Sequence, residues 1–361
     1  MRVKLEDVCE RGTSSLMQKD IVDKNGKYPV YGASGRIGSM ETYQQEHQTV
    51  AVVKDGAGIG RTMLLPEKSS VIGTMQYLIP KNCIESEYLY YVVKYMHLEK
   101  YFSGATIPHI YFRDYKTEEF NLHDKTEQRE IVSTLKRIEA IISNRQEQLT
   151  KLDELVKARF VEMFGDPKLN PYRFPCNSLS TYITFLTSGS RGWSQYFTNS
   201  GEYFITIKNV KNCKITLQDV QYVAPPDNAE AKRTKVQKND LLISITADLG
   251  RTGVVTEEIA NHGAYINQHL TCIRLKDEQV NPLYVAYYME SDAGKEQFTA
   301  KNQSAVKAGL NFNAINSLKL MAPPLSLQNQ FAAFVAEVDK SKLFAELFAQ
   351  SACILAENRS K

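Results

Sequence analysis

The sequence predicts an α+β fold with two tandem α/β domains, separated by two long helices that pair as an antiparallel coiled coil. Three observations lead to this prediction. The chain contains an internal repeat, each copy holds short strand-like runs, and each copy closes with a long charged stretch of helical character. The chain has 361 residues, which is enough for two or three domains at about 150 residues each.

The composition is that of an ordinary globular protein, with 43% hydrophobic and 24% charged residues, and it excludes a collagen or a disordered chain. No apolar run has the length of a transmembrane helix, and the N-terminus MRVKLEDVCERG is too charged for an export signal. Six cysteines are scattered without a C-x-x-C pair. We therefore expect a cytoplasmic protein with reduced cysteines and without a membrane partner. The six histidines do not cluster, so we expect no metal site, and we expect no cofactor in this chain.

The charge is nearly balanced, with a net value of +3. The excess lies in residues 165–322, which hold 17 Lys and Arg against 14 Asp and Glu. So weak an imbalance leaves a DNA partner open and does not argue for one.

The internal repeat consists of matched residues that keep their order in both halves of the chain. Gly60-Arg61-Thr62 returns as Gly250-Arg251-Thr252, and each triplet follows an apolar run. The offset drifts from 190 to 200 residues, as expected for two diverged copies with a few insertions. The other matched residues are Leu89-Tyr90 with Leu283-Tyr284; Ile110, Phe112, Tyr115 and Phe120 with Leu310, Phe312, Ile315 and Leu320; and Gln128 and Ile131 with Gln328 and Phe331.

Each copy begins with strand-like runs that are bounded by Gly, Pro, Asn and Asp. The runs are VAVVK, TMLLP and QYLIP in the first copy, and EYFITI, KITL, DLLISI and LTCIRL in the second. A helical segment follows in each copy, YLYYVVKYM and LYVAYYMES. We place the two globular domains at residues 1–122 and 165–322.

Residues 124–164 contain no Gly or Pro and predict one helix within the segment 123–164. Gly165 and Pro167 end it, and at 1.5 Å per residue it would be roughly 60 Å long. Its side chains form two rows at heptad spacing, which is typical of a coiled-coil seam. The rows are Leu135, Ile142, Leu149, Val156 and Met163, and Ile131, Ile138, Arg145, Leu152 and Arg159.

A second long helix is predicted within residues 323–361, after Pro323-Pro324. Its rows contain small residues, which allow a partner helix to approach closely. We expect the two long helices to pack on each other, because one small domain cannot cover a helix of this length; the alternative is that each packs only on its own domain. The rows are Phe331, Val338, Ala345 and Ala352, and Val335, Lys342, Ala349 and Ala356.

This order of domain, long helix, domain and long helix resembles the specificity subunit of a Type I restriction-modification system. Residues 104–142, GATIPHIYFRDYKTEEFNLHDKTEQREIVSTLKRIEAII, resemble the junction between a target-recognition domain and the central helix. The usual Pro-Pro-Leu and Glu-Gln pattern is kept in part, as Glu127-Gln128 in one copy and as Pro323-Pro324-Leu325 with Gln328 in the other. Residues 27–38, KYPVYGASGRIG, resemble the opening of such a domain. The resemblance extends over essentially the whole chain.

The resemblance implies a non-catalytic reader of double-stranded DNA. Each domain would read one half of a bipartite, asymmetric target, and the helices would set the spacer between the halves. The chain would bind two methyltransferase subunits and direct adenine N6 methylation, and with restriction subunits it would direct cleavage. The helix residues that would dock these partners are Ile131, Leu135, Ile138, Ile142, Leu149, Leu152 and Val156.

Two segments imitate catalytic sites. Residues 55–60, DGAGIG, look like the glycine loop of a methyltransferase that binds S-adenosylmethionine. Such a loop must open a helix, whereas RTMLLPEKSS reads as a strand, so we expect a tight turn that brings Arg61 close to DNA. Residues 226–232 imitate a metal-dependent nuclease signature, but their two acids lie too close together in sequence, so we expect a solvated loop.

The candidate DNA contacts are side chains next to predicted turns, where Arg and Gln can pair with base edges or phosphates. Two domains that read different bases should differ where they touch them. We therefore expect the matched Arg61 and Arg251 at phosphates, and base readout in the unmatched loops 32–38 and 189–196. The full set is Ser34, Arg36, Lys54, Arg61, Thr62, Gln76, Arg191, Trp193, Lys208, Arg251, Thr252 and Gln268.

Three other functions remain open at this point. They are the recognition subunit of another type of restriction enzyme, a coiled-coil scaffold with two protein-binding domains, and a stand-alone methyltransferase or nuclease. A scaffold would show no preference for DNA at any salt concentration, and an enzyme would turn over by itself.

Overall fold

The computed structural model describes residues 1–21, 26–104, 107–302 and 309–360, with side chains as far as residue 344. The chain divides into two compact units. Unit 1 is Met1–Leu149 with Phe344–Lys361, and unit 2 is Thr150–Leu343. None of the helices in the described parts of the chain is long and apolar enough to span a membrane.

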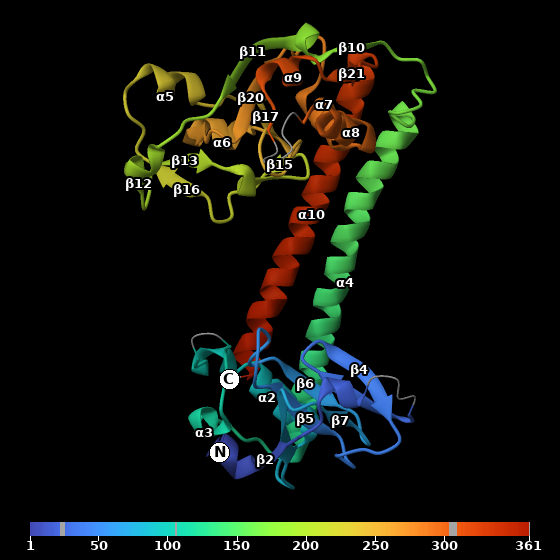
Figure 1. The fold of residues 1–361 in the computed structure, drawn as a ribbon, viewed down its shortest axis with the longest axis vertical. Coiled ribbons are helices and arrows are strands. Elements are labelled where there is room, and N and C mark those ends of the chain that lie inside the picture. Colours follow the sequence, from blue (N-terminus) through green and yellow to red (C-terminus); the bar gives the residue numbers. More distant parts are fainter. Residues whose placement is uncertain (22–25, 105–106, 303–308, 361) are drawn as a thin grey trace. The chain divides into compact units, whose positions relative to one another are not determined.

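Unit 1 is built around an antiparallel four-stranded sheet (Figure 1). Its central strand β5 (Thr49–Val53) is buried along its whole length. Because side chains alternate along a strand, Val50 and Val52 enter one apolar core and Ala51 and Val53 enter another. The strand order is β2 (Cys9–Thr13), β8 (Met75–Pro80), β5 and β6 (Thr62–Leu65).

A smaller sheet and one helix cover the two faces of this sheet. The smaller sheet supplies Val71 and Tyr31 to the core formed by Ala51 and Val53. Helix α2 (Ser86–Lys94) supplies Leu89 to the other core. The order in the smaller sheet is β4 (Gly35–Met40), β3 (Tyr28–Gly32) and β7 (Ser70–Val71), with β3 and β7 parallel. The remaining elements are β1 (Arg2–Lys4), α1 (Leu5–Val8), η1 (Gln18–Asp20), η2 (Leu98–Tyr101), α3 (Phe112–Tyr115) and β9 (Glu119–Asn121).

Unit 2 is larger and carries the same kind of antiparallel four-stranded sheet. Its order is β11 (Ile183–Ser188), β20 (Leu270–Leu275), β17 (Leu241–Ser244) and β18 (Thr252–Val254). A second sheet has the order β12 (Phe197–Thr198), β16 (Gln221–Val223), β13 (Glu202–Ile205) and β19 (Ala264–Ile266). The remaining strands are β10 (Cys176–Ser178), β14 (Val210–Lys211), β15 (Lys214–Ile215) and β21 (Lys319–Met321).

The helices of unit 2 are short, apart from its share of the two long ones. Residues 226–232, expected as a solvated loop, run into helix α5, where the side chain of the N-cap Asn228 accepts from the amide of Ala231 at 2.8 Å. The helices are η3 (Leu179–Tyr182), η4 (Trp193–Tyr196), η5 (Ile207–Asn209), α5 (Ala229–Thr234), α6 (Glu257–His262), α7 (Pro282–Glu290), α8 (Asp292–Lys301) and α9 (Phe312–Asn316).

The two units repeat one topology, as the repeat in the sequence predicts. Strands β2, β8, β5 and β6 correspond in order to β11, β20, β17 and β18. The parallel pair of β3 and β7 corresponds to that of β13 and β19. In each unit an antiparallel ribbon joins the first strand to the last one before the long helix, β1 with β9 and β10 with β21.

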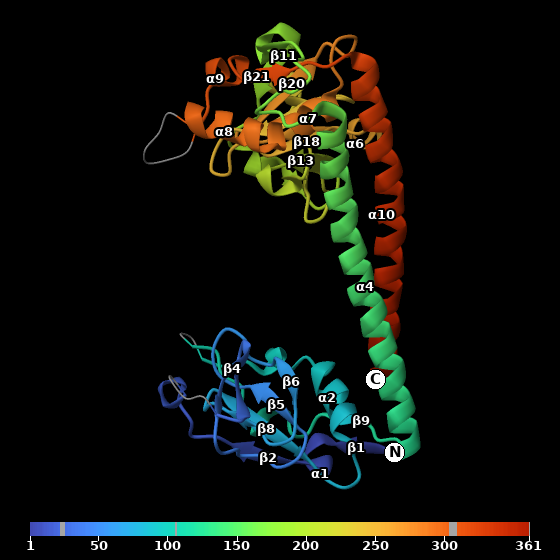
Figure 2. The same cartoon turned by 90° about the vertical axis from the view of Figure 1, so that its right-hand side faces the viewer.

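The long helices are α4 (Lys125–Phe164) and α10 (Leu325–Ser360). In unit 2 the end of α4 lies beside the start of α10, and the two run antiparallel (Figure 2). The ring centroids of Phe160 and Phe331 are 5.3 Å apart. Further along α10, Lys342 forms an ion pair with Asp153, which lies before Phe160 in α4. The two contacts together show that the helices run in opposite directions here.

The heptad rows of α4 also complete the cores of the two domains. Ile131, Leu135 and Ile138 pack in the core of unit 1, and Leu152 and Val156 pack in the core of unit 2. The start of α4 therefore packs in unit 1 and its end packs in unit 2, where it also meets α10. The predicted row members Ala345, Ala349, Ala352 and Ala356 lie outside the residues whose side chains are described.

Replacing Phe331 with alanine should destabilise unit 2. The side chain is fully buried among the rings of Phe160, Phe164 and Tyr287, so its loss should lower the free energy of unfolding by about 3–5 kcal/mol. The measurement is urea unfolding followed by the fluorescence of Trp193, the one tryptophan of the chain. The matched control is Phe344→Ala on the same helix, which is exposed and should change stability by less than about 0.5 kcal/mol. Equal midpoints for the two variants would contradict this account of the core.

Candidate nucleic-acid interface

One tight turn occurs at the same place in both units. In unit 1 it joins β5 to β6, with the amide of Val53 donating to the carbonyl of Arg61 at 2.9 Å and that of Gly60 donating to Val53 at 2.9 Å. In unit 2 the amide of Ser244 donates to Arg251 at 2.9 Å and that of Gly250 to Ser244 at 3.0 Å. As predicted, residues 55–60 connect two strands and do not open a helix.

Glycine is required in this turn for two reasons. The φ angles of Gly60 and Gly250 are +80° and +79°, a region that residues with a Cβ rarely adopt. There is also no room, because a Cβ on Gly60 would lie 2.7 Å from the amide nitrogen of Glu99, and one on Gly250 would lie 2.3 Å from the ring of Phe298. The turn therefore fixes the position of the arginine that follows it.

In unit 1 the turn is tied to the loop between β3 and β4. The guanidinium of exposed Arg61 donates to the carbonyl of Ala33 at 2.7 Å. The next residue, Ser34, and Arg36 on β4 are exposed as well. Three predicted DNA contacts, Ser34, Arg36 and Arg61, thus lie on one polar surface of unit 1.

Lys54 lies at the start of the same turn but is largely neutralised. Its ammonium group is 2.8 Å from Asp55, which also accepts a hydrogen bond from His109 at 2.7 Å. Partial burial alone would raise the pKa of the Asp55 carboxyl, but these two hydrogen bonds outweigh it and hold the pKa below its ordinary value. Asp55 is therefore ionised at neutral pH and offsets the charge of Lys54.

In unit 2 the matched arginine has a different partner. Arg251 is held by Asp248, with 2.5 Å from its Nε to the carboxylate. Thr252 was expected at the surface, but it is fully buried and donates to the carbonyl of Ala286 at 3.2 Å and to Glu290 at 3.0 Å. In unit 1 the half-buried hydroxyl of Thr62 donates to the carbonyl of Gly60 at 3.2 Å. Thr62 therefore holds the turn of unit 1, whereas Thr252 ties the strand after the turn of unit 2 to α7.

Gln76 is an interior residue, which corrects the expectation that it contacts DNA. It lies on β8, is 2% exposed, and its amide donates to the hydroxyl of Tyr115. Burial raises the pKa of Tyr115, so this hydroxyl is a neutral acceptor. The matched Gln268 is half-buried in the loop between β19 and β20, beside the ring of His269.

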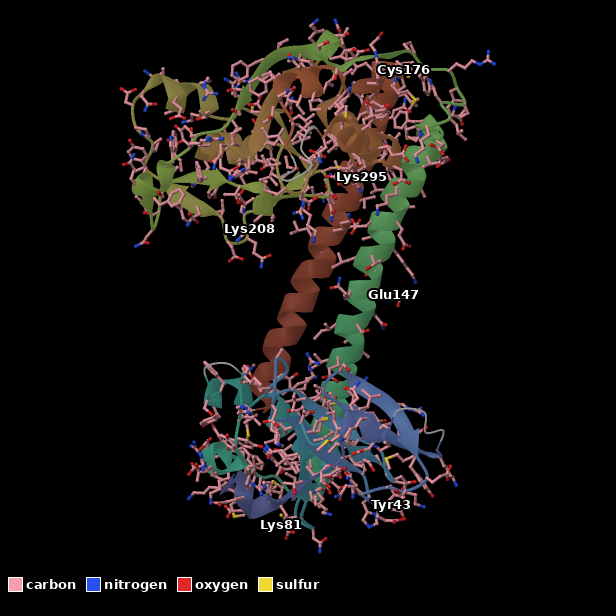
Figure 3. All side chains as sticks on the ribbon, in the orientation of Figure 1. Tyr43, Lys81, Glu147, Cys176, Lys208 and Lys295 are labelled. Atoms are coloured by element: carbon pink, nitrogen blue, oxygen red, sulfur yellow. The ribbon has the colours of Figure 1, made fainter. Side chains whose placement is uncertain are left out.

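Trp193 is a core residue as well, and this corrects a second expectation. Its ring lies between Phe204 and Tyr265, and its indole nitrogen donates to Glu230 at 3.2 Å. Arg191, two residues earlier, is exposed. Lys208 is exposed in η5 of the same unit (Figure 3). In the loop 189–196 of unit 2, Arg191 therefore remains accessible for DNA contact, whereas Trp193 does not.

One organising residue, Glu290 at the end of α7, was missed by the sequence analysis. One of its carboxylate oxygens accepts from the amide of Cys213 at 3.1 Å and from the amide and hydroxyl of Thr252 at 2.9 and 3.0 Å. It fixes the strand that follows the turn of unit 2. No local pattern marks it, because its partners are far away in the sequence.

Comparisons with known proteins agree with this architecture. Residues 1–153 and 194–347 match the family model of the Type I restriction modification DNA specificity domain. The chain therefore belongs to this family of DNA specificity domains.

Individual relatives are distant. The specificity subunit of the Type I restriction enzyme EcoBI from Escherichia coli is 20% identical over 140 residues, which are 38% of this chain and 28% of that protein. The chain thus matches less than a third of the length of that curated relative.

Two solved structures share the fold along the whole chain. The S subunit of a Type I restriction-modification system from M. genitalium matches with a TM-score of 0.60 and 15% identity, over all of this chain and 95% of that one. A chain from a structure on the assembly and conformational transition of the Type I system matches with a TM-score of 0.59 and 16% identity, over all of this chain and 96% of that one.

Substituting Gly250 by alanine should destabilise unit 2 through the turn. The positive φ costs about 1–2 kcal/mol for a residue with a Cβ, and overpacking against Phe298 adds about 1–3 kcal/mol. The control is Gly192→Ala, which has a similar φ of +70° but no atom within 4 Å of the added Cβ, so only the smaller cost applies. Urea unfolding monitored by Trp193 fluorescence distinguishes them, and equal losses would show that crowding at Gly250 is unimportant.

Proposed function

We propose that this chain is the specificity subunit of a Type I restriction-modification complex and has no active site of its own. Residues 1–122 and 165–322 are its target-recognition domains. Each reads one half of a bipartite, asymmetric target in double-stranded DNA. The chain directs adenine N6 methylation by two bound methyltransferase subunits and, with restriction subunits, cleavage.

One observation carries this proposal: the family of DNA specificity domains matches twice, in the two regions whose strand order repeats. Two copies of one scaffold with different surface residues are suited to reading two different half-sites. The surfaces do differ, since Arg61 contacts a backbone carbonyl and Arg251 a carboxylate. A single-domain reader would need no such duplication.

The long helices are proposed as the spacer. Helix α4 is one uninterrupted helix of 40 residues, or about 60 Å, and half-sites one turn of B-DNA apart are separated by about 34 Å. We extend the antiparallel contacts of Phe160 with Phe331 and of Asp153 with Lys342 into a coiled coil along 123–164 and 323–361. The heptad rows of the sequence support this extension.

Methyltransferase docking is assigned to the outer face of α4. Five of the seven residues expected to dock these subunits are used in the chain's own cores, and Ile142 and Leu149 are half-buried. By contrast Ile141, Leu155 and Val161 are each about half exposed. We propose these exposed apolar side chains as contacts for the docked subunits, with Ile141 in unit 1 and Leu155 and Val161 in unit 2.

The proposal is tested by sequencing methylated adenines in cells that express this chain with a Type I methyltransferase subunit, and in cells that express either alone. A new split motif that appears only with both is the expected result. Methylation by this chain alone would refute the proposal. If no motif appears although the two proteins copurify, and the complex shows no DNA preference at low salt, the chain is a scaffold.

The same experiment tests the spacer. Inserting four residues, about one helical turn, into the middle of α4 should change the gap of the motif and leave both half-sites as they were. An unchanged gap would refute the spacer role of the helices.

Two arginines of unit 1 should have different effects on DNA binding. Arg61→Ala should weaken binding uniformly across sequences and reduce the salt slope by about 1, as for a lost phosphate contact. Arg36→Ala should cost about 1–3 kcal/mol and relax the preference in one half-site. The control is Arg2→Ala, an exposed arginine of β1 that is paired with Glu119. Titrations of the complex with matched and mismatched duplexes at several salt concentrations give these quantities, and identical profiles for the Arg36 and Arg61 variants would contradict the assignment.

A further inference from the structure

Each long helix is joined to its domain by one fully buried glutamine. In unit 1 this is Gln128, in the first turn of α4. Its side-chain oxygen accepts from the amide of Glu85 at 2.8 Å, and its nitrogen donates to the carbonyls of Cys83 at 3.0 Å and His123 at 2.9 Å. The side chain thus links α4 to the residues that lead into α2, and to the residues that lead into α4 itself.

Unit 2 has the same joint with Gln328, in the first turn of α10. Its oxygen accepts from the amide of Asn281 at 2.9 Å, and its nitrogen donates to the carbonyl of Pro323 at 2.7 Å. Asn281 is the N-cap of α7, as Glu85 is of α2. The two copies of the repeat therefore build the same joint from the same side-chain type, although the residues that donate to the glutamine oxygen differ, Glu85 in one copy and Asn281 in the other.

The chemistry of the joint requires an amide. A primary amide offers an acceptor and a donor in one plane, so a single side chain can hold two backbone segments at once. A carboxylate at this place would lack the donor, and an apolar side chain would leave buried backbone groups unpaired. The apolar contacts around it do not depend on direction, whereas these hydrogen bonds fix how the helix is rotated against its domain.

The other links across the joints are weaker. In unit 1 Glu85 also forms ion pairs with Arg129 at 2.9 Å and Lys125 at 3.5 Å. Both cations are at least half exposed, where such pairs contribute little. In unit 2 the side-chain amide of Asn281 donates to the side-chain oxygen of exposed Asn329 at 2.9 Å.

Further along the long helices, Tyr91 of α2 donates to Glu139 of α4 at 2.7 Å, and Lys214 forms an ion pair with Asp339 of α10. At the start of each long helix, the glutamine is a fully buried side chain that holds the helix to its domain by hydrogen bonds.

We propose that Gln128 and Gln328 are positioning residues that fix the angle of each recognition domain on its helix, and thereby the gap at which both half-sites can be bound together. This inference rests on the proposed function. Neither side chain contacts DNA, because both are fully buried. Their role is separate from base readout. Their loss should therefore weaken the selectivity for one gap length between the half-sites and leave the preference for bases within each half-site unchanged.

The test uses the full chain in complex with its methyltransferase subunits. The variants are Gln128→Met and Gln328→Met, which keep the length of the side chain and remove its hydrogen bonds. The control is Gln330→Met, which replaces an exposed glutamine of α10. Methylation rates are measured on duplexes with the correct half-sites and with gaps one or two base pairs shorter or longer, and then on duplexes with the correct gap and single half-site changes.

Each buried variant should raise the relative rate on a gap that is wrong by one base pair by about 2- to 10-fold, the factor that corresponds to a typical buried hydrogen bond. Half-site preference should stay as in the wild type, and the control should show no change. If gap selectivity is unchanged in the folded variants, or if half-site preference relaxes instead, the inference is overturned. A wild-type complex that methylates no split site at all would refute the proposed function itself.

A folding check keeps the result interpretable. Trp193 fluorescence and circular dichroism establish that each variant is folded before it is assayed. If a methionine variant does not accumulate, Gln128→Glu and Gln328→Glu replace it, because they keep the acceptor and lose only the donor. These variants place a carboxylate oxygen against the backbone carbonyls that the glutamine nitrogen binds, so they should lose at least as much gap selectivity. Unchanged selectivity in them also overturns the inference.

Discussion

Each domain of this protein completes its hydrophobic core with a face of its own long helix. In unit 1 the helix side chains Val132 and Leu135 are buried with Leu89 of α2 and Val50 of β5. In unit 2 Phe160 and Phe164 of α4 are buried with Phe331 of α10. Removing the helix would expose a large part of either core. In each unit the helix that leaves the domain is therefore also part of the domain's interior.

The two units share their internal scaffold and differ in the polar side chains around the matched turns. The sheet order, the turn glycines and the buried glutamines are the same in both units. The polar groups around the matched turns differ, with Lys54, Asp55 and His109 in one unit and Asp248 and Arg251 in the other. This division suits a protein in which one backbone presents two different surfaces.

Much of the fold could be predicted from the sequence, because its main signals are local. The stretch without Gly or Pro forms α4, and the glycine-rich segment 55–60 forms a turn between strands. The site was harder to predict. Gln76, Trp193 and Thr252 lie beside turns, yet they point inward, since these sheets are covered on both faces and polar side chains find partners in the interior. The contacts of Gln76 with Tyr115 and of Thr252 with Glu290 join residues distant in sequence, which no local pattern indicates.

The two-stranded ribbons have a consequence for how such a chain can change. The chain enters and leaves each domain along one ribbon, where Arg2 lies opposite Asn121 and Cys176 lies opposite Met321. The segment in between is a closed loop whose ends are hydrogen-bonded neighbours. A foreign segment that keeps the two edge strands and the helix-facing apolar residues can take its place without moving the helices. The geometry thus brings both ends of each domain to one place next to the start of a long helix, so the segment between the ribbon strands can vary in length without changing where the chain meets that helix.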